Sequence, residues 1–532
     1  MKLSALLPSL ALSASVASAR RSLQHVGTVM DRLGQPLKAP ADSRSTREYP
    51  TKRADSGFQF LTNKTQKYVV DGTAIPDVDF DVGESYAGLM PLGNSTEDEF
   101  YFWFFPSTNA AADGEILIWL NGGPGCSSLE GLLQENGPFL WQYGTYKPVQ
   151  NPYSWTRLTN VVYIEQPVGT GFSQGTPTAQ DEEDVADQFK LFWKNFVDTF
   201  GLKGSKVYIT GESYAGMYVP YIASGMLDEE DSTYFNVSGI MIYDPSIAYD
   251  FLQGSMTVMP FVDSNEVLFP LDTDALATYH ALDTDCGYAD FRDKYLSYPP
   301  PGVMPGPNNL PGKGNLTCTG LYDKVYNGIT AKNPCFDIYQ VATTCPVLWD
   351  VLGFPGSFEY LPEGASVYFN RSDVQAAINA PSVEWSTCSD VNVFPHGDGS
   401  APSATTVLGS VVDRTQNVVV GHGLLDMVLI AEGTLLAIQN MTWGGKQGFQ
   451  REPTADFVVP RHADYSDSTL AAQGVMGTTH TERGLTWVTI ELSGHMVPQY
   501  QPSAAFRQLE FLLGRVNSLS SSKPFTVSVA TV

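Results

Sequence analysis

The sequence predicts an α/β fold built on a doubly wound, mostly parallel sheet. Short apolar runs of strand length recur along the chain, and several of them lack both charges and clean alternation. Strands that helices cover on both faces have this composition. Helical or loop segments separate the runs, which span residues 116–120, 161–164, 207–210, 240–243, 418–420 and 487–492.

The N-terminal residues 1–19 are predicted to be a signal peptide. Lys2 gives a positive start, residues 3–16 are short and mainly apolar, and residues 17–19, Ala-Ser-Ala, form a small-residue cleavage site. The alternatives are an N-terminal core helix and a membrane anchor. Pro8 and the small-residue end argue against both.

Residues 20–53 are polar and basic and end in a Lys-Arg pair, which predicts a pro-segment and a mature chain of residues 54–532. Entry into the secretory pathway also predicts disulfides from the six cysteines, whose fifteen possible pairings stay open on spacing alone. The cysteines are Cys126, Cys286, Cys318, Cys335, Cys345 and Cys388. Six glycosylation sequons fit the same route, at Asn63, Asn94, Asn236, Asn315, Asn370 and Asn440. We therefore expect a secreted or vacuolar protein.

Composition limits the classes of function. The chain has 532 residues, 43% of them hydrophobic, and a net charge of −26. A core of enzyme size is therefore expected, while the negative charge opposes binding to nucleic acid and to anionic membranes. No C-x-x-C or H-E-x-x-H spacing occurs, so we expect no zinc site, and no spanning helix is expected after the signal peptide.

The sequence GESYAG occurs twice, at residues 83–88 and at residues 211–216. Before the first copy the chain is acidic and poorly hydrophobic, and a proline follows soon after, so no helix can continue there. Ser85 is therefore predicted to lie in an early antiparallel strand that leads to residues 100–105.

The second copy has the setting of a nucleophile. A strand-like run leads into G-x-S-x-G, and helix-compatible residues 217–226 follow. This strand, sharp turn and helix form the nucleophile elbow of α/β-hydrolases, in which flanking glycines leave room for the turn. We predict Ser213 as the nucleophile. The preceding residues 184–200, with apolar positions on one face, are predicted to be a crossover helix.

The strand at residues 116–120 ends in a glycine-rich loop with the sequence NGGPGCSS, residues 121–128. In α/β-hydrolases such a loop supplies one backbone N–H of the oxyanion hole, and the residue after the nucleophile supplies the other. We predict Gly123 and Tyr214 as these donors. The alternatives are an ordinary glycine turn and a phosphate loop, but the latter requires a following G-K-S/T.

Residues 246–405 differ from the rest of the chain. Prolines and glycines cluster at residues 298–314, and five of the six cysteines fall in the span. We predict a disulfide-stapled insertion that forms a lid over the sheet and shapes the substrate pocket.

The remaining members of a catalytic triad are predicted from their positions after strands. His495 lies just beyond the run at residues 487–492, and Asp426 follows another short strand. The order Ser, Asp, His is that of α/β-hydrolases. Asp413 is a fallback for the acid. The rival histidines, which we expect on the surface or in loops, are His422, His462 and His480.

At this point the chain resembles the serine carboxypeptidase family. Five motifs carry the resemblance, in family order: NGGPGCSS at 121–128, ENGPF at 135–139, PVGTGFS at 167–173, GESYAG at 211–216 and GHMVP at 494–498. The resemblance implies release of C-terminal amino acids from peptides and proteins, without a cofactor. It also implies that the substrate carboxylate is bound by Asn121, Glu135 and Glu212, and that Cys126 pairs with Cys388.

Two segments depart from the family pattern. After the strand at 240–243 the chain has Asp244-Pro245-Ser246 in place of Gly-Asn-Gly, and before Asp426 it has Gly421-His422-Gly423 in place of the common Gly-Asp segment. The second departure lies just before the predicted acid, Asp426.

The two glutamates and the substrate carboxylate that they face cannot all be ionised together, so at least one glutamate must keep its proton. Because substrate binding should then weaken as the pH rises, we predict an acidic pH optimum. A structural hydrogen bond is the alternative role for these glutamates. The alternative functions are an esterase or acyltransferase of the same fold, and a catalytically silent secreted binding protein.

Overall fold

The computed structural model describes residues 57–461 and 472–527. The predicted signal peptide and pro-segment lie outside these residues, and so does His462. No helix in the described part of the chain is long and apolar enough to cross a membrane.

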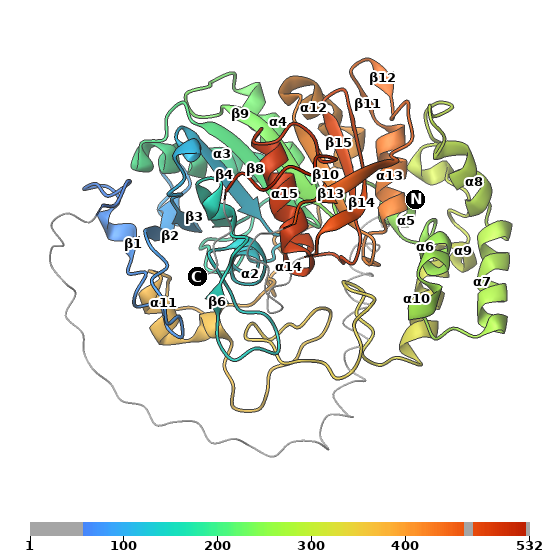
Figure 1. Cartoon of the computed structure of the whole chain (residues 1–532), viewed down its shortest axis with the longest axis horizontal. Coiled ribbons are helices and arrows are strands. Elements are labelled where there is room, and N and C mark those ends of the chain that lie inside the picture. The colour runs from blue at the N-terminus through green and yellow to red at the C-terminus, as the bar shows by residue number, and fades with distance from the viewer. Residues whose placement is uncertain (1–56, 462–471, 528–532) are drawn as a thin grey trace, which may run out of the picture.

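An eleven-stranded sheet forms the centre of the molecule (Figure 1). Its strand order is β1-β2-β3-β7-β4-β8-β9-β10-β15-β14-β13. The six strands from β7 to β15 in this order run parallel, and the strands at both edges are antiparallel. The bounds are β1 (Val69–Val70), β2 (Ser85–Pro91), β3 (Glu99–Phe105), β4 (Glu115–Leu120), β7 (Val161–Glu165), β8 (Lys206–Glu212), β9 (Val237–Tyr243), β10 (Val418–Gly423), β13 (Ala455–Val459), β14 (Gly474–Glu482) and β15 (Leu485–Ile490).

Both faces of the sheet are covered. Along β4, Ile116 and Ile118 pack into one hydrophobic core, while Leu117 and Trp119 pack into another on the opposite face. The first core is closed by α3 (Glu182–Phe200), α4 (Ala215–Asp228) and α12 (Leu408–Thr415). The second is closed by α2 (Ser128–Gly131), α14 (Val497–Tyr500) and α15 (Pro502–Leu512). This arrangement confirms the predicted doubly wound α/β fold.

Between β9 and β10 the chain leaves the sheet for residues 244–417. Helices α6 to α10 of this segment lie together beside the sheet (Figure 1). The helices before α12 are α5 (Asp250–Gln253), α6 (Val258–Ser264), α7 (Thr273–Asp285), α8 (Tyr288–Tyr295), α9 (Leu316–Thr319), α10 (Leu321–Thr330) and α11 (Ser372–Ala377). We call residues 244–407 the cap.

The six cysteines form three disulfides. Two lie within the cap, Cys286–Cys318 and Cys335–Cys345. The third, Cys126–Cys388, joins the cap to the loop after β4 across 262 residues of sequence, and it is the pair that the family resemblance implies.

Most of the expected elements are present, with small changes in length. The run at 487–492 stops being a strand at Ile490, and Leu492 beyond it is exposed with a positive φ of 59°. The antiparallel strands β13 and β14 were not predicted. The remaining small elements are α13 (Ala431–Asn440) and two short ribbons, β5 (Phe139–Leu140) with β6 (Val149–Gln150) and β11 (Thr442–Trp443) with β12 (Lys446–Gln447).

Candidate active site

Ser213 occupies a sharp turn between β8 and α4, with a positive φ of 61°. Its N–H donates to the carbonyl of Tyr243 at 2.9 Å, and its carbonyl accepts from the N–H of Ser246 at 2.9 Å. A Cβ on Gly216 would lie 2.7 Å from the Ser246 nitrogen, and one on Gly211 would lie 2.3 Å from a carbonyl oxygen of β4. The two glycines of the motif are therefore required by close backbone packing.

Ser85, in the other copy of the motif, lies in β2, which pairs antiparallel with β3, as expected.

The glycine loop after β4 packs directly on this turn. A Cβ on Gly122 would lie 2.4 Å from the nitrogen of Tyr214 and 2.8 Å from the Cβ of Ser213. Gly123 has a positive φ of 112°. Within the described part of the chain, the N–H groups of Gly123 and Tyr214 donate no hydrogen bond to another residue. Two unpaired donors beside a serine are what an oxyanion hole requires.

His495 and Asp426 are both buried and lie in contact. The Nδ1 atom of His495 is 2.8 Å from Oδ2 of Asp426, whose Oδ1 accepts from the N–H of Val428 at 2.7 Å. The main chain of His495 is fixed by its own N–H, which donates to the carbonyl of Tyr339 at 2.8 Å. The Nε2 atom is buried and makes no hydrogen bond to a described residue, which leaves it able to accept a proton.

Electrostatics at His495 favour its charged form. Burial of the ring lowers its pKa, but the carboxylate of Asp426 and the hydrogen bond to it outweigh burial, so the pKa of His495 is raised. An imidazole of this kind is stabilised as it takes a proton.

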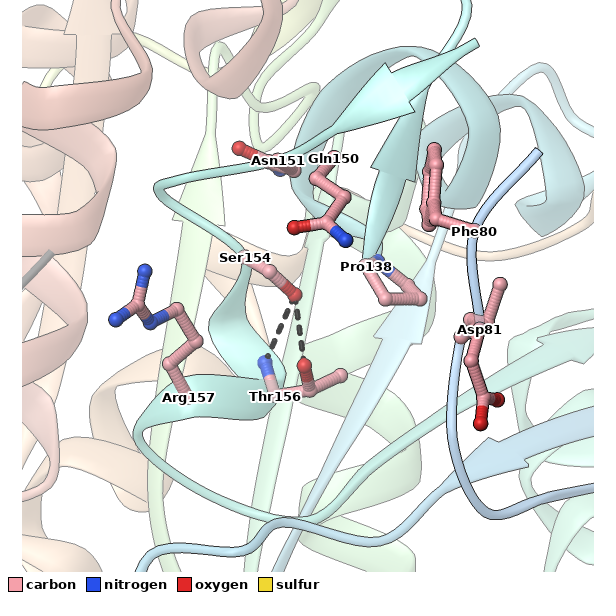
Figure 2. A pocket seen from close by; sticks show the side chains of 9 residues that line it. Phe80, Asp81, Pro138, Gln150, Asn151, Ser154, Thr156 and Arg157 are labelled. Atoms are coloured by element: carbon pink, nitrogen blue, oxygen red, sulfur yellow. Dashed lines mark hydrogen bonds between the residues drawn. The ribbon is translucent and has the colours of Figure 1, made fainter. Parts of the chain in front are cut away.

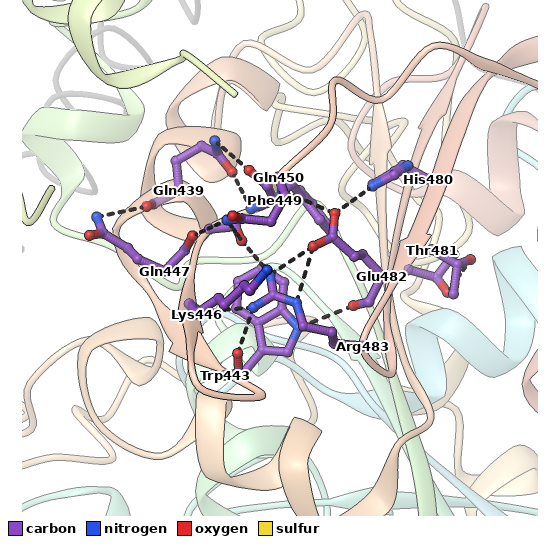
Figure 3. A network of polar contacts seen from close by, with 12 residues as sticks. Gln439, Trp443, Lys446, Gln447, Phe449, Gln450, His480, Thr481, Glu482 and Arg483 are labelled. Carbon is purple, nitrogen blue, oxygen red and sulfur yellow. Dashed lines mark hydrogen bonds and ion pairs between the residues drawn. The ribbon is translucent and has the colours of Figure 1, made fainter. Parts of the chain in front are cut away.

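The rival residues lie elsewhere. His480 lies in β14 and contacts Glu482 at 3.1 Å, within a polar network that also holds Arg483 (Figure 3). Asp413 lies on α12 and accepts from the N–H of Gly444 at 2.6 Å.

The position of His422 differs from the prediction. It was expected on the surface or in a loop, but it lies fully buried in β10. The valine-rich run before it is short, so the sequence pattern did not show that the strand continues through residues 421–423.

Three polar side chains that the family resemblance implies for carboxylate binding lie together next to Ser213. The Nδ2 atom of Asn121 donates to Oε1 of Glu212 at 2.8 Å and to Oε1 of Glu135 at 3.3 Å. The orientation of this amide is fixed by the indole N–H of Trp119, which donates to Oδ1 at 2.7 Å, and by the N–H of Gly131 at 3.2 Å. Sequence reasoning did not assign a role to Trp119 or Gly131.

The two glutamates are buried, and neither second oxygen has a hydrogen-bond partner among the described residues. Burial raises the pKa of Glu135 to about 7. Burial and the neighbouring Glu135 raise the pKa of Glu212 well above its usual range. Below neutral pH the pair therefore presents protonated oxygens that can donate to an anion.

Another buried acid, Glu165 at the end of β7, holds the surroundings of the site together. It accepts hydrogen bonds from the hydroxyl of Ser127, the N–H of Phe172 and, at 3.1 Å, the indole of Trp385 in the cap. A Cβ on Gly171 would lie 2.0 Å from its carboxylate. The PVGTGFS motif therefore wraps this carboxyl group, a role that the sequence did not indicate.

A surface hollow lies apart from these residues (Figure 2). It contains none of the predicted nucleophile, base or carboxylate-binding side chains. Its lining residues are Phe80, Asp81, Val82, Pro138, Gln150, Asn151, Ser154, Thr156 and Arg157. Asn151 braces the segment after Glu135 by donating to the carbonyl of Gly137 at 2.9 Å, which indicates a structural role.

Comparison with known proteins agrees with this geometry. The serine carboxypeptidase family matches residues 76–514. A probable serine carboxypeptidase of Arthroderma benhamiae is 52% identical over 530 residues, covering 96% of this chain and 98% of that protein. Serine-type carboxypeptidase F of Aspergillus niger is 48% identical over 483 residues, covering 87% and 89%.

A solved structure shares the fold. The crystal structure of Kex1(delta)p, a prohormone-processing carboxypeptidase from Saccharomyces cerevisiae, covers 85% of this chain and 96% of its own, with a TM-score of 0.66 at 22% identity. The family match and the two fungal relatives extend over most of the sequence. The chain therefore belongs to the serine carboxypeptidase family, and it is a serine-type carboxypeptidase.

Proposed function

We propose that the enzyme removes C-terminal residues at acidic pH through Ser213, His495 and Asp426. One observation carries the proposal: the buried glutamate pair directly adjoins the turn that holds the serine, with Glu212 next to Ser213 in sequence. A free carboxylate held there would place the last peptide bond of the substrate at the serine. The substrates would then be peptide and protein C-termini.

In the proposed mechanism the hydroxyl oxygen of Ser213 attacks the last peptide carbonyl while Nε2 of His495 takes the hydroxyl proton. The N–H groups of Gly123 and Tyr214 stabilise the oxyanion. His495 then gives its proton to the leaving amine, and the C–N bond breaks. Water, deprotonated by His495, hydrolyses the acyl-enzyme and restores the serine.

The geometry supports a carboxylate site that depends on pH. As the pH rises through about 7, Glu135 loses its proton and repels a bound carboxylate, so we expect KM for a free-acid peptide to rise. A blocked ester that lacks a terminal carboxylate would not feel this repulsion.

The test compares an N-blocked dipeptide, its C-terminal amide and a blocked ester between pH 5 and 8. The wild-type enzyme should prefer the free acid, and KM for this substrate alone should increase by about tenfold over this range. Glu135→Gln cannot ionise, so its KM should vary much less with pH. Equal turnover of acid and amide, or an unchanged pH dependence in Glu135→Gln, would overturn the proposed carboxylate site and leave the glutamates with a structural role.

Ser213→Ala is the control for the nucleophile, because it should abolish turnover and labelling by an organophosphorus reagent while still binding the peptide. A folded, active wild-type protein that takes no label at Ser213 would show that Ser213 is not the nucleophile.

We also propose that the protein passes through the secretory pathway. Three disulfides are typical of proteins that fold in an oxidising compartment, and this supports passage through the secretory pathway to the vacuole or the exterior. Among the sequons, Asn63, Asn94 and Asn315 are exposed, which suits glycosylation. Asn370 is a poorer acceptor, because its amide donates to the carbonyl of Trp385 at 2.7 Å and accepts from the N–H of the same residue.

A further inference from the structure

A second buried carboxyl group lies behind the catalytic pair. Asp244 immediately follows β9, is fully buried and has a positive φ of 42°. His422, in the neighbouring strand β10, is also fully buried. Each residue belongs to one of the two segments that depart from the family pattern, and the two segments are therefore in contact.

One oxygen of Asp244 is well satisfied. Its Oδ1 accepts from the N–H of Gly423 at 2.9 Å and lies 2.8 Å from Nδ1 of His422. On the other side of the ring, Nε2 of His422 is 3.1 Å from the hydroxyl of Thr434. Burial lowers the pKa of His422 to about 4, so the ring is neutral above this pH. Its Nδ1 atom lies against Asp244 and is 3.4 Å from the carbonyl oxygen of Gly423.

The carboxyl group of Asp244 also lies beside the proposed triad. Oδ2 of Asp244 is buried and has no hydrogen-bond partner among the described residues. One carboxylate oxygen of Asp244, one of Asp426 and one ring nitrogen of His495 all lie within 4.8 Å of one another. With His422 neutral, the titratable groups nearest to Asp244 are Asp426 and His495, and the charge of Asp244 is also felt by the buried Glu212. Two buried carboxylates this close cannot both ionise without a large cost.

We propose that Asp244 is a positioning residue that keeps its proton and donates it from Oδ2 as a hydrogen bond to Asp426. The inference rests on the proposed triad. His422 and Gly423 fix the rotation of the Asp244 carboxyl group, so that its acid oxygen points at Asp426. Burial and the charge of Asp426, which raise the pKa of Asp244 well above its usual range, are consistent with this protonation state.

The arrangement has a consequence for the base. An ionised Asp244 would place a second negative charge near His495 and hold the imidazole in its protonated form. A protonated Asp244 leaves a single negative charge behind the ring. His495 can then lose its proton, and act as the base, at a lower pH than it could beside two carboxylates.

Two substitutions separate these states. Asp244→Asn suits the positive φ, keeps an acceptor for Gly423 and His422, and presents a permanent N–H donor to Asp426. Asp244→Gly also suits the backbone but removes both groups. Each variant is assayed on the blocked ester, which avoids the carboxylate site, and kcat is expressed per Ser213 labelled by the organophosphorus reagent, which excludes unfolded protein.

We expect Asp244→Asn to keep kcat within about threefold of wild type, with the acidic limb of its pH profile displaced by less than about 0.3 units, whereas Asp244→Gly should lose at least about tenfold in kcat. A downward shift of the acidic limb by about half a unit or more in Asp244→Asn would mean that Asp244 is ionised in the working enzyme, and would overturn the proposal. Wild-type kcat in Asp244→Gly, or equal losses in both variants, would overturn it as well.

Two controls complete the experiment. The same three groups could hold a cation, so the wild-type enzyme is dialysed against EDTA; loss of activity that a divalent ion restores would also overturn the proposal. If Ser213 of the wild-type enzyme takes no label, the proposed triad has failed, and that outcome is distinct from a failure of the Asp244 assignment.

Discussion

Single residues in left-handed backbone conformations surround the reacting atoms. Ser213 and Asp244 tolerate such conformations because each is held by hydrogen bonds to neighbouring strands, whereas Gly123, with a φ of 112°, has no side chain to strain. The strain at these positions is offset by the sheet around them. The backbone at each of these residues is therefore as much part of the site as the side chains.

Substitution at Gly123 is expected to disable catalysis with little effect on binding. A Cβ there would lie 2.7 Å from both the nitrogen and the sulfur of Cys126, so the loop must move and its N–H with it. We expect Gly123→Ala to lower kcat about 100-fold, measured per labelled Ser213, with a small change in KM.

Gly114→Ala is the matched control. Gly114 also has a positive φ, of 71°, but a Cβ there meets nothing within 4 Å. This variant should lose some thermal stability and keep its kcat. If Gly123→Ala keeps kcat within about threefold of wild type, Gly123 is not an oxyanion donor.

At this scale the sequence predicted residues that stand in recognisable motifs, and it failed where a role depends on distant contacts. Ser213 was predicted from a strand, a glycine-flanked turn and a helix, and His495 from its place just beyond a strand. Asp244 and His422 were noted as departures from the family pattern, but their contact depends on the register of β9 against β10. No single-sequence signal shows that register.

At the scale of elements, the loop after β4 is held by the cap. The N–H of Ser127 donates to the carbonyl of Thr387, and the N–H of Ser389 donates to the carbonyl of Gly125, both at 2.8 Å. The disulfide between Cys126 and Cys388 lies between these two bonds. The cap therefore fixes the loop that supplies one of the proposed oxyanion donors.

Removing this disulfide should affect both stability and catalysis. We expect the Cys126→Ala, Cys388→Ala double variant to be destabilised by about 2–5 kcal/mol, because the bond closes a very long loop, and to lose about tenfold in kcat as the glycine loop is released. Thermal unfolding and ester hydrolysis per labelled serine measure the two effects.

The matched control is the Cys286→Ala, Cys318→Ala double variant, which removes a disulfide of 32 residues' separation inside the cap. It should lose stability but keep kcat. Equal kcat in the two double variants would show that the cap does not hold the glycine loop in its active position.

The core strands were predictable from their short apolar runs, and the crossover helix α3 from apolar residues that recur on one face. The edge strands β13 and β14 were missed because only five of their fourteen residues are buried, so neither strand carries a continuous apolar run. The fold class was therefore predictable from the central strands, and the number of strands was not.

At the scale of the whole molecule, the protein is acidic, with a net charge of −26, and several of its carboxyl groups are buried. Burial raises the pKa of Glu135 to about 7, of Glu165 to about 7 and of Asp337 to about 6. In the unfolded chain such groups ionise near pH 4. The folded protein therefore binds more protons than the unfolded chain between about pH 4 and 7.

Stability should accordingly be greatest in acid and fall as the pH rises. A carboxyl group with a raised folded pKa contributes stability below its unfolded pKa and loses it as the pH passes through the folded value, so the loss falls between about pH 4.5 and 7.5. For Glu165 alone it is on the order of 3 kcal/mol. Calorimetry should show Tm falling by at least about 5 °C over this window.

Glu165→Gln provides the check, because an amide mimics the protonated acid and does not titrate. Its Tm should fall less steeply with pH than that of wild type. Carboxylates with lowered pKa, such as Asp79 and Asp272, act only below about pH 4, outside the window. A wild-type Tm that stays level or rises between pH 4.5 and 7.5 would contradict this account.

The position of the cap also bears on how such enzymes diversify. The chain leaves the sheet after β9 and returns at β10, and these two strands are neighbours. The ends of a long excursion therefore meet at one place, and its contents can lengthen, shorten or be exchanged without altering the order of the strands. On the prediction that the cap shapes the substrate pocket, selection can change which side chains are accepted next to the cleaved bond without altering the sheet, and the disulfide to Cys126 is the covalent bond that ties the cap to the glycine loop.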